Sequence, residues 1–344
     1  MQAGCTAAIL GTMTDTTDHS TEILSASDQD ALQRASDLLA AGEVVAFPTE
    51  TVYGLGANGL DARAVEKIFV AKSRPADNPL ILHVSSIQEA IPLWRAEERQ
   101  IELVRDLARA FWPGPLSLVL PAAARIPSIT TGGLDSVAVR APAHPVAQAL
   151  LNLCPFPLAA PSANLSGRPS PTQAEHVFAT LSGRIAAILD GGRTDLGIES
   201  TVLDLCGDRP RLLRPGMVSK EAIEAVAGPV DMAGDVADAP SPGLRHRHYR
   251  PKDVQLQLAN TMTIEMQWSE DVGLMCRQDT ADRLGGRAAS LLVMPEDAEA
   301  YAAELYHALY QLEQSDCKNH LIEKVPDRTE WSAIRDRLDR AVGG

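Results

Sequence analysis

Short strand-like stretches alternate with amphipathic, helix-like stretches over residues 27–228, and this alternation limits the folds open to the chain. Residues 27–42 carry apolar side chains at helical spacing with Ser27 as a candidate cap, and Pro48 stops a strand-like run at residues 43–47. Strands interleaved with helices are typical of an α/β sheet domain. Further strand-like runs lie at residues 79–84, 116–120, 137–140, 157–160, 185–189, 201–205 and 211–213. Further helix-like runs begin after Asp61 and cover residues 99–112, 144–153, 172–182 and 219–227.

The composition changes on both sides of this region. From about residue 229 the chain is rich in Ala, Asp, Gly and Pro without periodicity, which predicts a linker over residues 229–253. Strand and helix patterns then resume, and they predict a smaller, Rossmann-like α/β domain over residues 254–344. Residues 1–26 are rich in Thr, Ser, Ala and Asp, and we expect a disordered extension there.

Charge and composition argue against several classes of protein. The chain has 31 Lys and Arg against 45 Asp and Glu and only 4% aromatic residues, so we expect little direct binding of nucleic acid. No apolar run approaches the roughly 18 residues of a membrane span. The five cysteines are scattered without a C-x-x-C motif, which argues against disulfides or a zinc knuckle. Since Arg34 is the first basic residue, a secretory or transit signal does not fit, and we expect a cytoplasmic protein.

A glycine-rich stretch at residues 54–59 matches G-x-G-x-x-G between a predicted strand and a predicted helix. Such a match is the signature of a dinucleotide site when the glycines directly follow the strand. Here Pro48 and a polar stretch intervene, and no acidic residue follows the second strand. The pattern therefore favours the alternative, a turn that lets two backbone segments approach closely.

Basic residues stand at several predicted element ends. Lys72 and Arg74 follow a helix, where they also complement the helix dipole, and Arg140 and Arg214 each end a strand. The densest basic run, residues 245–252, falls in the predicted linker. Strand-end arginines in α/β sheets commonly line the ligand crevice, and converging cations suit a triphosphate. The set therefore indicates a phosphate site.

Hydroxyl-rich loops at residues 160–167 and 170–172 offer donors for phosphate or carboxylate oxygens. A serine hydrolase is the rival interpretation, but the chain has no G-x-S-x-G elbow and no evident acid–histidine pair. His246 and His248 could bind a metal, although no third ligand stands near them in the sequence.

Seven motifs together carry a resemblance to a known family, the L-threonylcarbamoyladenylate synthases. In order they read FPTETVYGLGANGLDARAVEKIFVAKSRPADNPLILHV, FWPGPLSLVL, TGGLDSVAVRAP, APSANLSGRPSPT, GIESTVLDL, LLRPG and SPGLRHRHYRP. The resemblance covers about residues 27–342 and is to the longer, two-domain form. It implies a YrdC-type catalytic domain with a twisted mixed sheet over residues 27–228, the linker at 229–253 folding over the active site, and the Rossmann-like domain. Such enzymes condense L-threonine, bicarbonate or CO2, and ATP into threonylcarbamoyl-AMP with release of pyrophosphate.

The resemblance also implies roles for individual residues. Lys72 and Arg74 would be catalytic and would neutralise charge on the phosphates. The residues implied for threonine are Thr51, His83, Arg140, Ala160 (through its backbone) and Ser200. The residues implied for ATP are Arg74, Asn78, Ser136, Ser162, Ser170, Arg214 and Tyr249.

The resemblance implies Mg²⁺ held mainly by the phosphates of ATP, and no organic cofactor. The product would serve N6-threonylcarbamoylation of tRNA at the adenosine next to the anticodon, through downstream threonylcarbamoyl-transfer proteins. Two alternatives stay open at this point. One is a non-catalytic module for double-stranded RNA or ribosome maturation, and the other is a carbamoyl-transfer domain of hydrogenase maturation proteins.

Overall fold

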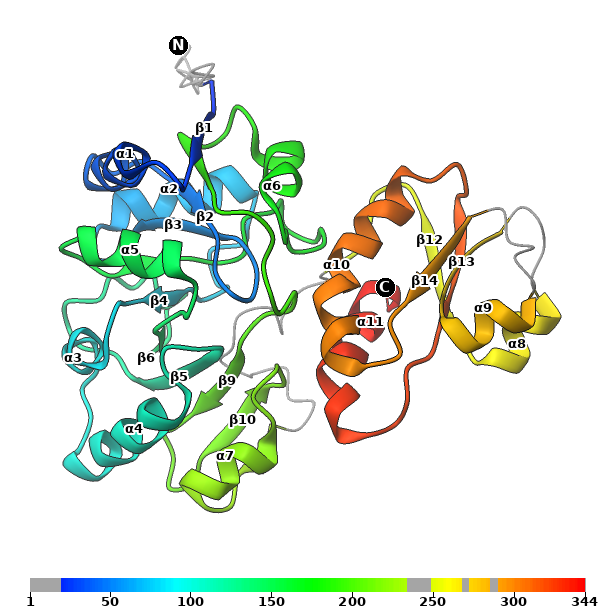
Figure 1. Cartoon of the computed structure of the whole chain (residues 1–344). Helices are drawn as coiled ribbons and strands as arrows, with labels where there is room; N and C mark the ends of the chain where they lie inside the picture. The colour runs from blue at the N-terminus through cyan, green and yellow to red at the C-terminus, as the bar shows by residue number, and fades with distance from the viewer. Residues whose placement is uncertain (1–19, 234–248, 268–271, 285–289, 344) are drawn as a thin grey trace, which may run out of the picture.

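The computed structural model describes residues 20–233, 249–267, 272–284 and 290–343. Figure 1 shows two α/β units, with helices α10 and α11 of the C-terminal unit on the side that faces the first unit. Every helix among the described residues is too short or too polar to span a bilayer. The basic run at residues 245–248, including His246 and His248, lies outside the described residues.

An eleven-stranded sheet in the order β1-β8-β2-β3-β7-β4-β6-β5-β9-β10-β11 forms the centre of the first unit. Its pairing is mixed, since β4 runs parallel to β6 whereas β5 and β6 are antiparallel. The predicted mixed α/β sheet is therefore confirmed. The strands are β1 (Glu22–Ser25), β2 (Val45–Phe47), β3 (Gly54–Asn58), β4 (Ile81–His83), β5 (Leu116–Pro121), β6 (Ser136–Arg140), β7 (Leu158–Ala159), β8 (Ala187–Asp190), β9 (Thr201–Asp204), β10 (Arg211–Arg214) and β11 (Asp231–Met232).

Three expectations about these strands are wrong. The extension predicted over residues 1–26 contains β1, whose Glu22–Ser25 pairs in parallel with β8 along a regular register. The linker predicted from residue 229 begins with β11, which adds to the edge of the sheet beside β10. Both strands are too short to show periodicity, and partners distant in sequence stabilise them. The glycine-rich turn is strand β3.

The glycines of β3 permit a close approach, as expected, but within the sheet. A Cβ on Gly56 would lie 2.9 Å from the Phe47 ring, and one on Gly54 would lie 3.3 Å from the Cβ of Ala160. Because β3 pairs antiparallel with β2, these glycines face a neighbouring strand and no dinucleotide turn is formed.

Within residues 20–233, seven α-helices accompany this sheet, and each buries at least one apolar side chain. The first helix is capped by Asp28, whose side chain accepts from the backbone of Asp30, so Asp28 rather than Ser27 is the cap. Within α2, Ala64, Val65 and Ile68 are buried in the main core. The helices are α1 (Gln29–Ala40), α2 (Ala62–Lys72), α3 (Ile87–Ala90), α4 (Glu98–Phe111), α5 (Pro145–Leu153), α6 (Ala174–Leu181) and α7 (Lys220–Ala227).

The C-terminal unit is built on a four-stranded sheet in the order β12-β15-β13-β14, with every pairing parallel. A parallel sheet with helical crossovers is the arrangement that the Rossmann-like prediction requires. Two short helices, α8 and α9, were not predicted. The elements are β12 (Gln255–Ala259), α8 (Thr261–Gln267), β13 (Val272–Arg277), α9 (Gln278–Leu284), β14 (Leu291–Met294), α10 (Ala298–Gln314), β15 (Asn319–Glu323) and α11 (Ser332–Val342).

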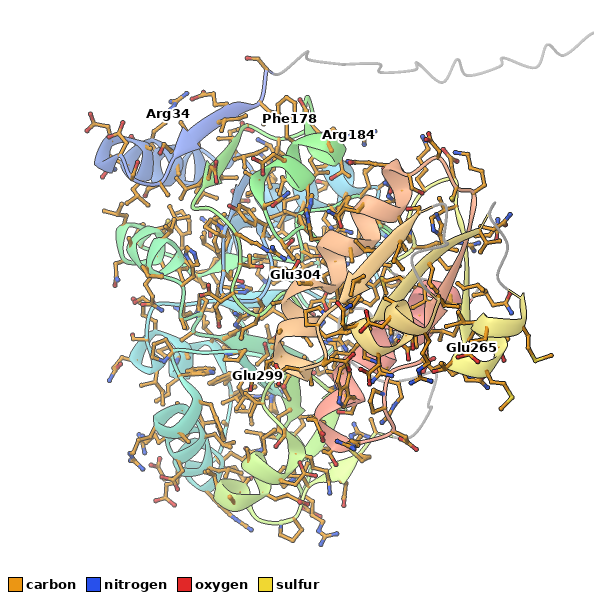
Figure 2. The ribbon with its side chains drawn as sticks, turned by 45° about the vertical axis from the view of Figure 1, so that its right-hand side comes forward. Arg34, Phe178, Arg184, Glu265, Glu299 and Glu304 are labelled. Atoms are coloured by element: carbon orange, nitrogen blue, oxygen red, sulfur yellow. The ribbon has the colours of Figure 1, made fainter. Side chains whose placement is uncertain are left out.

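The two units share a packed interface. Val52 and Ile198 of the first unit belong to one buried cluster with apolar residues of α10 and α11. Gly197, at φ +72°, lies against α10 so closely that a Cβ there would be 2.4 Å from the carbonyl oxygen of Ala302. Ion pairs flank this contact, and one joins Arg193 to Glu304 of α10 at 2.6 Å. Figure 2 labels Glu304 on this helix. The interface therefore brings α10 and α11 directly against the loop that precedes β9.

Candidate active site

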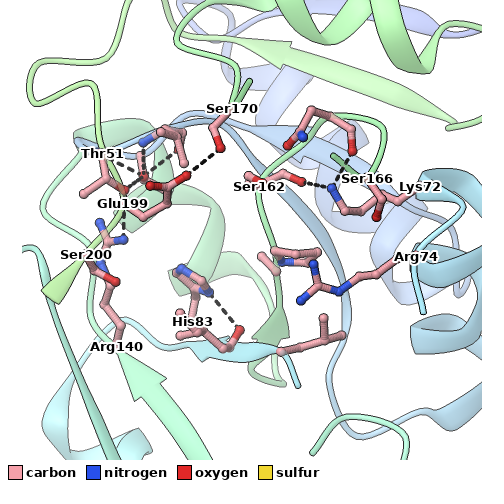
Figure 3. Close-up of a pocket in the computed structure, with 18 of the residues that line it drawn as sticks. Thr51, Lys72, Arg74, His83, Arg140, Ser162, Ser166, Ser170, Glu199 and Ser200 are labelled. Carbon is pink, nitrogen blue, oxygen red and sulfur yellow. Dashed lines mark hydrogen bonds between the residues drawn. The ribbon is translucent and has the colours of Figure 1, made fainter. Parts of the chain in front are cut away.

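A pocket opens where the ends of several first-unit strands meet (Figure 3). Parallel pairing of β4 with β6 places His83 opposite Arg140, so both side chains reach the same edge of the sheet. The remaining walls come from the loops between β2 and β3, after α2, after β7 and before β9. The lining residues include Thr49, Thr51, Lys72, Arg74, His83, Arg140, Ala160, Ser162, Asn164, Ser166, Arg168, Ser170, Glu199, Ser200, Arg214 and Tyr249.

Lys72 and Arg74 enter the pocket from the end of α2 (Figure 3). The helix stops at Ser73, whose left-handed backbone (φ 49°) turns the chain between the two cations. The Lys72 ammonium donates to the carbonyl oxygens of Ser162 and Asn164, and Arg74 donates to Pro79 at 3.2 Å. Among the described residues their hydrogen bonds go to carbonyl groups, so neither cation is neutralised by a contacting carboxylate.

Burial disfavours the charged forms of Lys72 and Arg74. Desolvation, followed by the nearby Arg74, lowers the pKa of Lys72 well below its usual value. Desolvation also lowers the pKa of Arg74 to about 10. An anion entering the pocket would favour the charged form of both groups. The pair is therefore arranged to bind a multiply charged anion such as a phosphate chain.

Arg140 and its partners form the opposite wall. The Arg140 guanidinium donates to Thr51 Oγ1 at 2.9 Å and to the Gly114 carbonyl at 3.2 Å. Glu50 lies 2.6 Å from the Arg140 Nη2, at an angle that does not make a hydrogen bond. Burial, and then Arg140, lower the pKa of His83 to about 3, so its ring is neutral at physiological pH. This wall can bind a carboxylate with a planar cation and a neutral ring beside it.

Ser200 and Arg214 connect the two walls. Arg214 donates from Nε to the Ser200 carbonyl at 3.1 Å and from Nη2 to the Ser200 hydroxyl at 3.2 Å. The Ser200 hydroxyl lies 2.8 Å from that of Ser117. Both Ser200 and Arg214 are buried, which holds the Arg214 guanidinium at the pocket in one orientation.

Glu199 is the pocket carboxylate, and its partners come from both units. It accepts from the Ser170 hydroxyl at 2.6 Å, from Tyr306 of α10 at 2.8 Å and from Arg337 of α11 at 3.0 Å. Burial alone would raise the pKa of Glu199, but Arg337, then Arg214 and the Ser170 hydrogen bond, lower it to about 2. Glu199 is therefore ionised at the boundary between the pocket and the C-terminal unit.

Tyr249 extends this boundary. Its ring lies 5.2 Å from the ring of Tyr306 and 5.9 Å from the Arg337 guanidinium, measured between centres. Tyr249 lines the pocket although it lies within the predicted linker, so the chain returns to the first unit at this point. Burial, and then Glu199, raise the pKa of Tyr249 to about 12, which keeps its hydroxyl protonated.

The pocket brings together most of the site residues predicted from the sequence. The predicted residues that line it are Thr51, Lys72, Arg74, His83, Arg140, Ala160, Ser162, Ser170, Ser200, Arg214 and Tyr249. Asn78 and Ser136 are not among the lining residues. The carbonyl of Asn78 lies 3.4 Å from the Arg74 Nε, so Asn78 supports that side chain from behind. Ser136 begins β6, at the opposite end of the strand from Arg140, and contacts the Cys206 thiol.

Sequence reasoning missed Glu50, Glu199, Tyr306 and Arg337, and it also missed Thr49, Asn164, Ser166 and Arg168 of the pocket lining. The first two stand directly beside predicted residues, in the PTET and GIEST motifs, and their adjacency to Thr51 and Ser200 was a usable signal. Tyr306 and Arg337 gave no signal, because more than a hundred residues separate them from their partner Glu199. In the described part of the chain, no group of three His, Cys, Asp or Glu side chains is placed to hold a metal ion.

Comparison with known proteins agrees with this arrangement along nearly the whole chain. A Sua5/YciO/YrdC family model described as "Telomere recombination" matches residues 37–216, and one described as "Threonylcarbamoyl-AMP synthase, C-terminal domain" matches residues 218–343. A Bacillus subtilis protein named threonylcarbamoyl-AMP synthase is 42% identical over 337 residues, covering 94% of this chain and 96% of its own length. A Pyrococcus abyssi protein of the same name is 41% identical, over 90% of this chain and 93% of its own. The solved structure of P. abyssi Sua5 complexed with L-threonine superposes with a TM-score of 0.84 at 38% identity, covering 94% of this chain and 97% of that one.

Proposed function

Because this chain belongs to the threonylcarbamoyl-AMP synthase family, we propose that its pocket binds ATP against L-threonine and joins them through a carbamate. The enzyme makes threonylcarbamoyl-AMP, the intermediate for N6-threonylcarbamoyladenosine in tRNA. The relatives carry this name along nearly the whole chain, so the alternative of a non-catalytic RNA-binding module has no support. The carbamoyl-transfer alternative is set aside for the same reason.

The observation that carries the substrate proposal is the division of one pocket into two walls. Lys72 and Arg74 offer cations that touch no carboxylate among the described residues, which suits the phosphates of ATP. Arg140 faces them with a planar fork beside the neutral His83, which suits the carboxylate of threonine. Ser162, Ser170, Arg214 and Tyr249 would complete the ATP side, and Thr51, Ala160 and Ser200 would complete the threonine side.

In our proposal the threonine amine loses a proton and attacks CO2, or bicarbonate with loss of water, to give a carbamate. A carbamate oxygen then attacks the α-phosphorus of ATP. The bond from that phosphorus to the bridging oxygen breaks, and pyrophosphate leaves. Catalysis consists of placing the carbamate in line and stabilising the leaving charge, the work assigned here to Lys72 and Arg74. No covalent intermediate with the protein is required.

Magnesium enters this proposal as part of the ATP substrate. Glu199 is the carboxylate that lines the pocket, and both of its oxygens are engaged by Ser170, Tyr306 and Arg337. The oxygens of the phosphates and of water are therefore the ligands that we expect for the ion.

The direct test is product formation by the purified protein. With threonine, bicarbonate and ATP together, we expect pyrophosphate release and a new adenylate with the mass of threonylcarbamoyl-AMP. Reactions that lack threonine or bicarbonate are the controls, and serine should be a much poorer substrate because it lacks the threonine methyl group. Pyrophosphate release no faster than with ATP alone, and no adenylate, would contradict the proposal.

A further inference from the structure

Arg337 of helix α11 is fully buried, although it belongs to the C-terminal unit and the pocket belongs to the first. Its guanidinium donates to Glu199 at 3.0 Å and to the neighbouring Asp336 at 2.7 Å, and it lies 5.9 Å from the centre of the Tyr249 ring. One of its nitrogens, Nη2, has no hydrogen-bond partner within the described residues. A buried guanidinium with an unmade hydrogen bond costs stability, so stability alone does not explain this arrangement.

The position of Glu199 creates an electrostatic problem for ATP. The carboxylate lines the pocket and binds Ser170, and it lies close enough to Arg214 for that cation to lower its pKa. Ser170, Arg214 and Tyr249 are all residues proposed to bind ATP. An ionised carboxylate among them would repel a triphosphate, because these groups are buried and water screens their charges weakly. A cation behind Glu199 removes that repulsion.

We propose that Arg337 is a positioning residue for the ATP side of the pocket. It neutralises Glu199 from behind, holds that carboxylate on Ser170, and supports the Tyr249 ring by packing against it. Tyr306 assists with its hydroxyl, which donates to the same carboxylate. The C-terminal unit thereby completes the nucleotide site of the first unit. This inference rests on the proposed assignment of Ser170, Arg214 and Tyr249 to ATP.

A merely structural ion pair would behave differently from a positioning residue. Loss of a structural pair lowers stability and the amount of active protein, which changes kcat but leaves both KM values alone. Loss of Arg337 as proposed leaves a buried carboxylate beside the phosphates, which raises KM for ATP specifically. Threonine lies against Arg140 and Thr51 in the proposal, and neither contacts the Arg337 side chain.

The test measures both KM values in three variants of the full-length enzyme. For Arg337→Met we expect KM for ATP to rise about tenfold or more, with KM for threonine within about twofold of wild type. For the double variant Glu199→Gln with Arg337→Met we expect KM for ATP to return to within about threefold of wild type, because neither charge remains. Arg335→Met is the matched control, since Arg335 is on the same helix but pairs with Asp327 at 2.5 Å, and both of its KM values should stay unchanged.

The outcomes separate this inference from the function on which it rests. A wild-type protein that makes no threonylcarbamoyl-AMP refutes the proposed function. An active wild type with an unchanged KM for ATP in Arg337→Met refutes the role of Arg337, as does a double variant no better than the single one. If Arg337→Met does not fold, Arg337→Gln replaces it, because its amide still donates to Glu199 without charge, and the same selective rise in KM for ATP is expected.

Discussion

The two walls of the pocket are built from different parts of the chain. The Arg140 side is held within the first unit, where Thr51, Gly114 and Glu50 surround the guanidinium. On the other side, Ser170 and Tyr249 depend on Glu199, Tyr306 and Arg337, and the last two come from the C-terminal unit. Each wall contains a buried carboxylate–arginine pair. In our proposal Arg140, the arginine of the first pair, faces threonine. In the second pair it is the carboxylate, Glu199, that faces ATP.

In our proposal the two ion pairs therefore have different tasks, although each joins a buried carboxylate to a buried arginine. Arg140 is proposed to bind threonine, so Glu50 serves to hold it. Arg337 is not among the residues that line the pocket, and its proposed task is to neutralise Glu199. Substitutions of individual residues test whether the two ion pairs differ in this way.

Lys72 should show the largest effect, because it stands on the ATP wall and is also proposed to act in the chemical step. For Lys72→Met we expect kcat to fall about 100- to 1,000-fold, since a preorganised cation stabilises the charge on the leaving group. The steady-state rate of pyrophosphate release measures this fall in kcat. Lys67→Met is the matched control, as Lys67 lies on the same helix, is exposed and pairs with Glu43 at 2.8 Å. If the two variants had equal activity, the phosphate role of Lys72 would be wrong.

Arg140→Met should act on the threonine side alone. We expect KM for threonine to rise about 100-fold while KM for ATP stays within about twofold, because the carboxylate loses a charged, bidentate partner. The variant also leaves Glu50 buried without its cation, so the free energy of unfolding should fall by about 3 kcal/mol. Kinetics in both substrates and urea unfolding measure the two effects. A comparable rise in KM for ATP in Arg140→Met would contradict the proposal that the two walls bind different substrates.

Tyr249→Ala should give a smaller effect, confined to ATP. The ring packs against Tyr306 and Arg337, and loss of such contacts is worth about 1–1.5 kcal/mol, so KM for ATP should rise about five- to tenfold. Tyr249→Phe keeps the ring and should show a smaller rise. An unchanged dissociation constant for ATP in Tyr249→Ala would mean that this residue does not contribute to the nucleotide side.

His83 offers the smallest effect, which appears in stability against pH. Because its pKa in the folded protein is about 3, below the ordinary 6.5, the unfolded chain binds a proton between these values that the folded chain does not. Stability from this source is complete above pH 6.5 and is lost as the pH falls, by at most about 1.4 kcal/mol per pH unit. His83→Gln should lessen the loss between pH 6.5 and 5.

The Glu199 pair serves as the internal reference for the His83 experiment. The pKa of Glu199 is about 2, so its contribution is lost only as the pH falls below the ordinary value of 4.5. The window between pH 6.5 and 5 therefore isolates the histidine titration from the Glu199 pair. Urea unfolding at pH 6.5 and at pH 5 measures how much the free energy of unfolding falls between them. An equal fall in wild type and in His83→Gln would show that His83 is not buried in its neutral form.

Local sequence information was sufficient for the pocket residues that stand at element ends. Lys72 and Arg140 could be predicted because each ends a helix or a strand and the sheet brings those ends together, whereas Thr51 was predicted only through the family resemblance. The same reasoning failed for β1 and β11, since strands of four and two residues carry no periodicity and depend on distant partners. It also treated the β3 glycines as a turn, because a glycine pattern does not reveal which strand will lie opposite.

The contribution of the C-terminal unit to the pocket was beyond sequence reasoning. Arg337 lies on an amphipathic helix where a charged residue normally indicates a solvent-exposed face, yet docking of α11 buries it completely. Its partner Glu199 stands 138 positions earlier in the chain. Such a pair forms only when the two folded units pack together, and a local sequence pattern does not indicate how they pack.

The most direct test of the difference between the two walls compares two charge-neutral double variants, Glu50→Gln with Arg140→Met and Glu199→Gln with Arg337→Met. Both KM values and the free energy of unfolding would be measured for each. We expect both double variants to recover stability relative to their single arginine variants. KM for ATP should recover when Arg337 and Glu199 are replaced together, whereas KM for threonine should stay raised about 100-fold when Arg140 and Glu50 are replaced together. Recovery of substrate binding in both double variants, or in neither, would contradict the division of the pocket into a threonine wall held by the first unit and an ATP wall completed by the second.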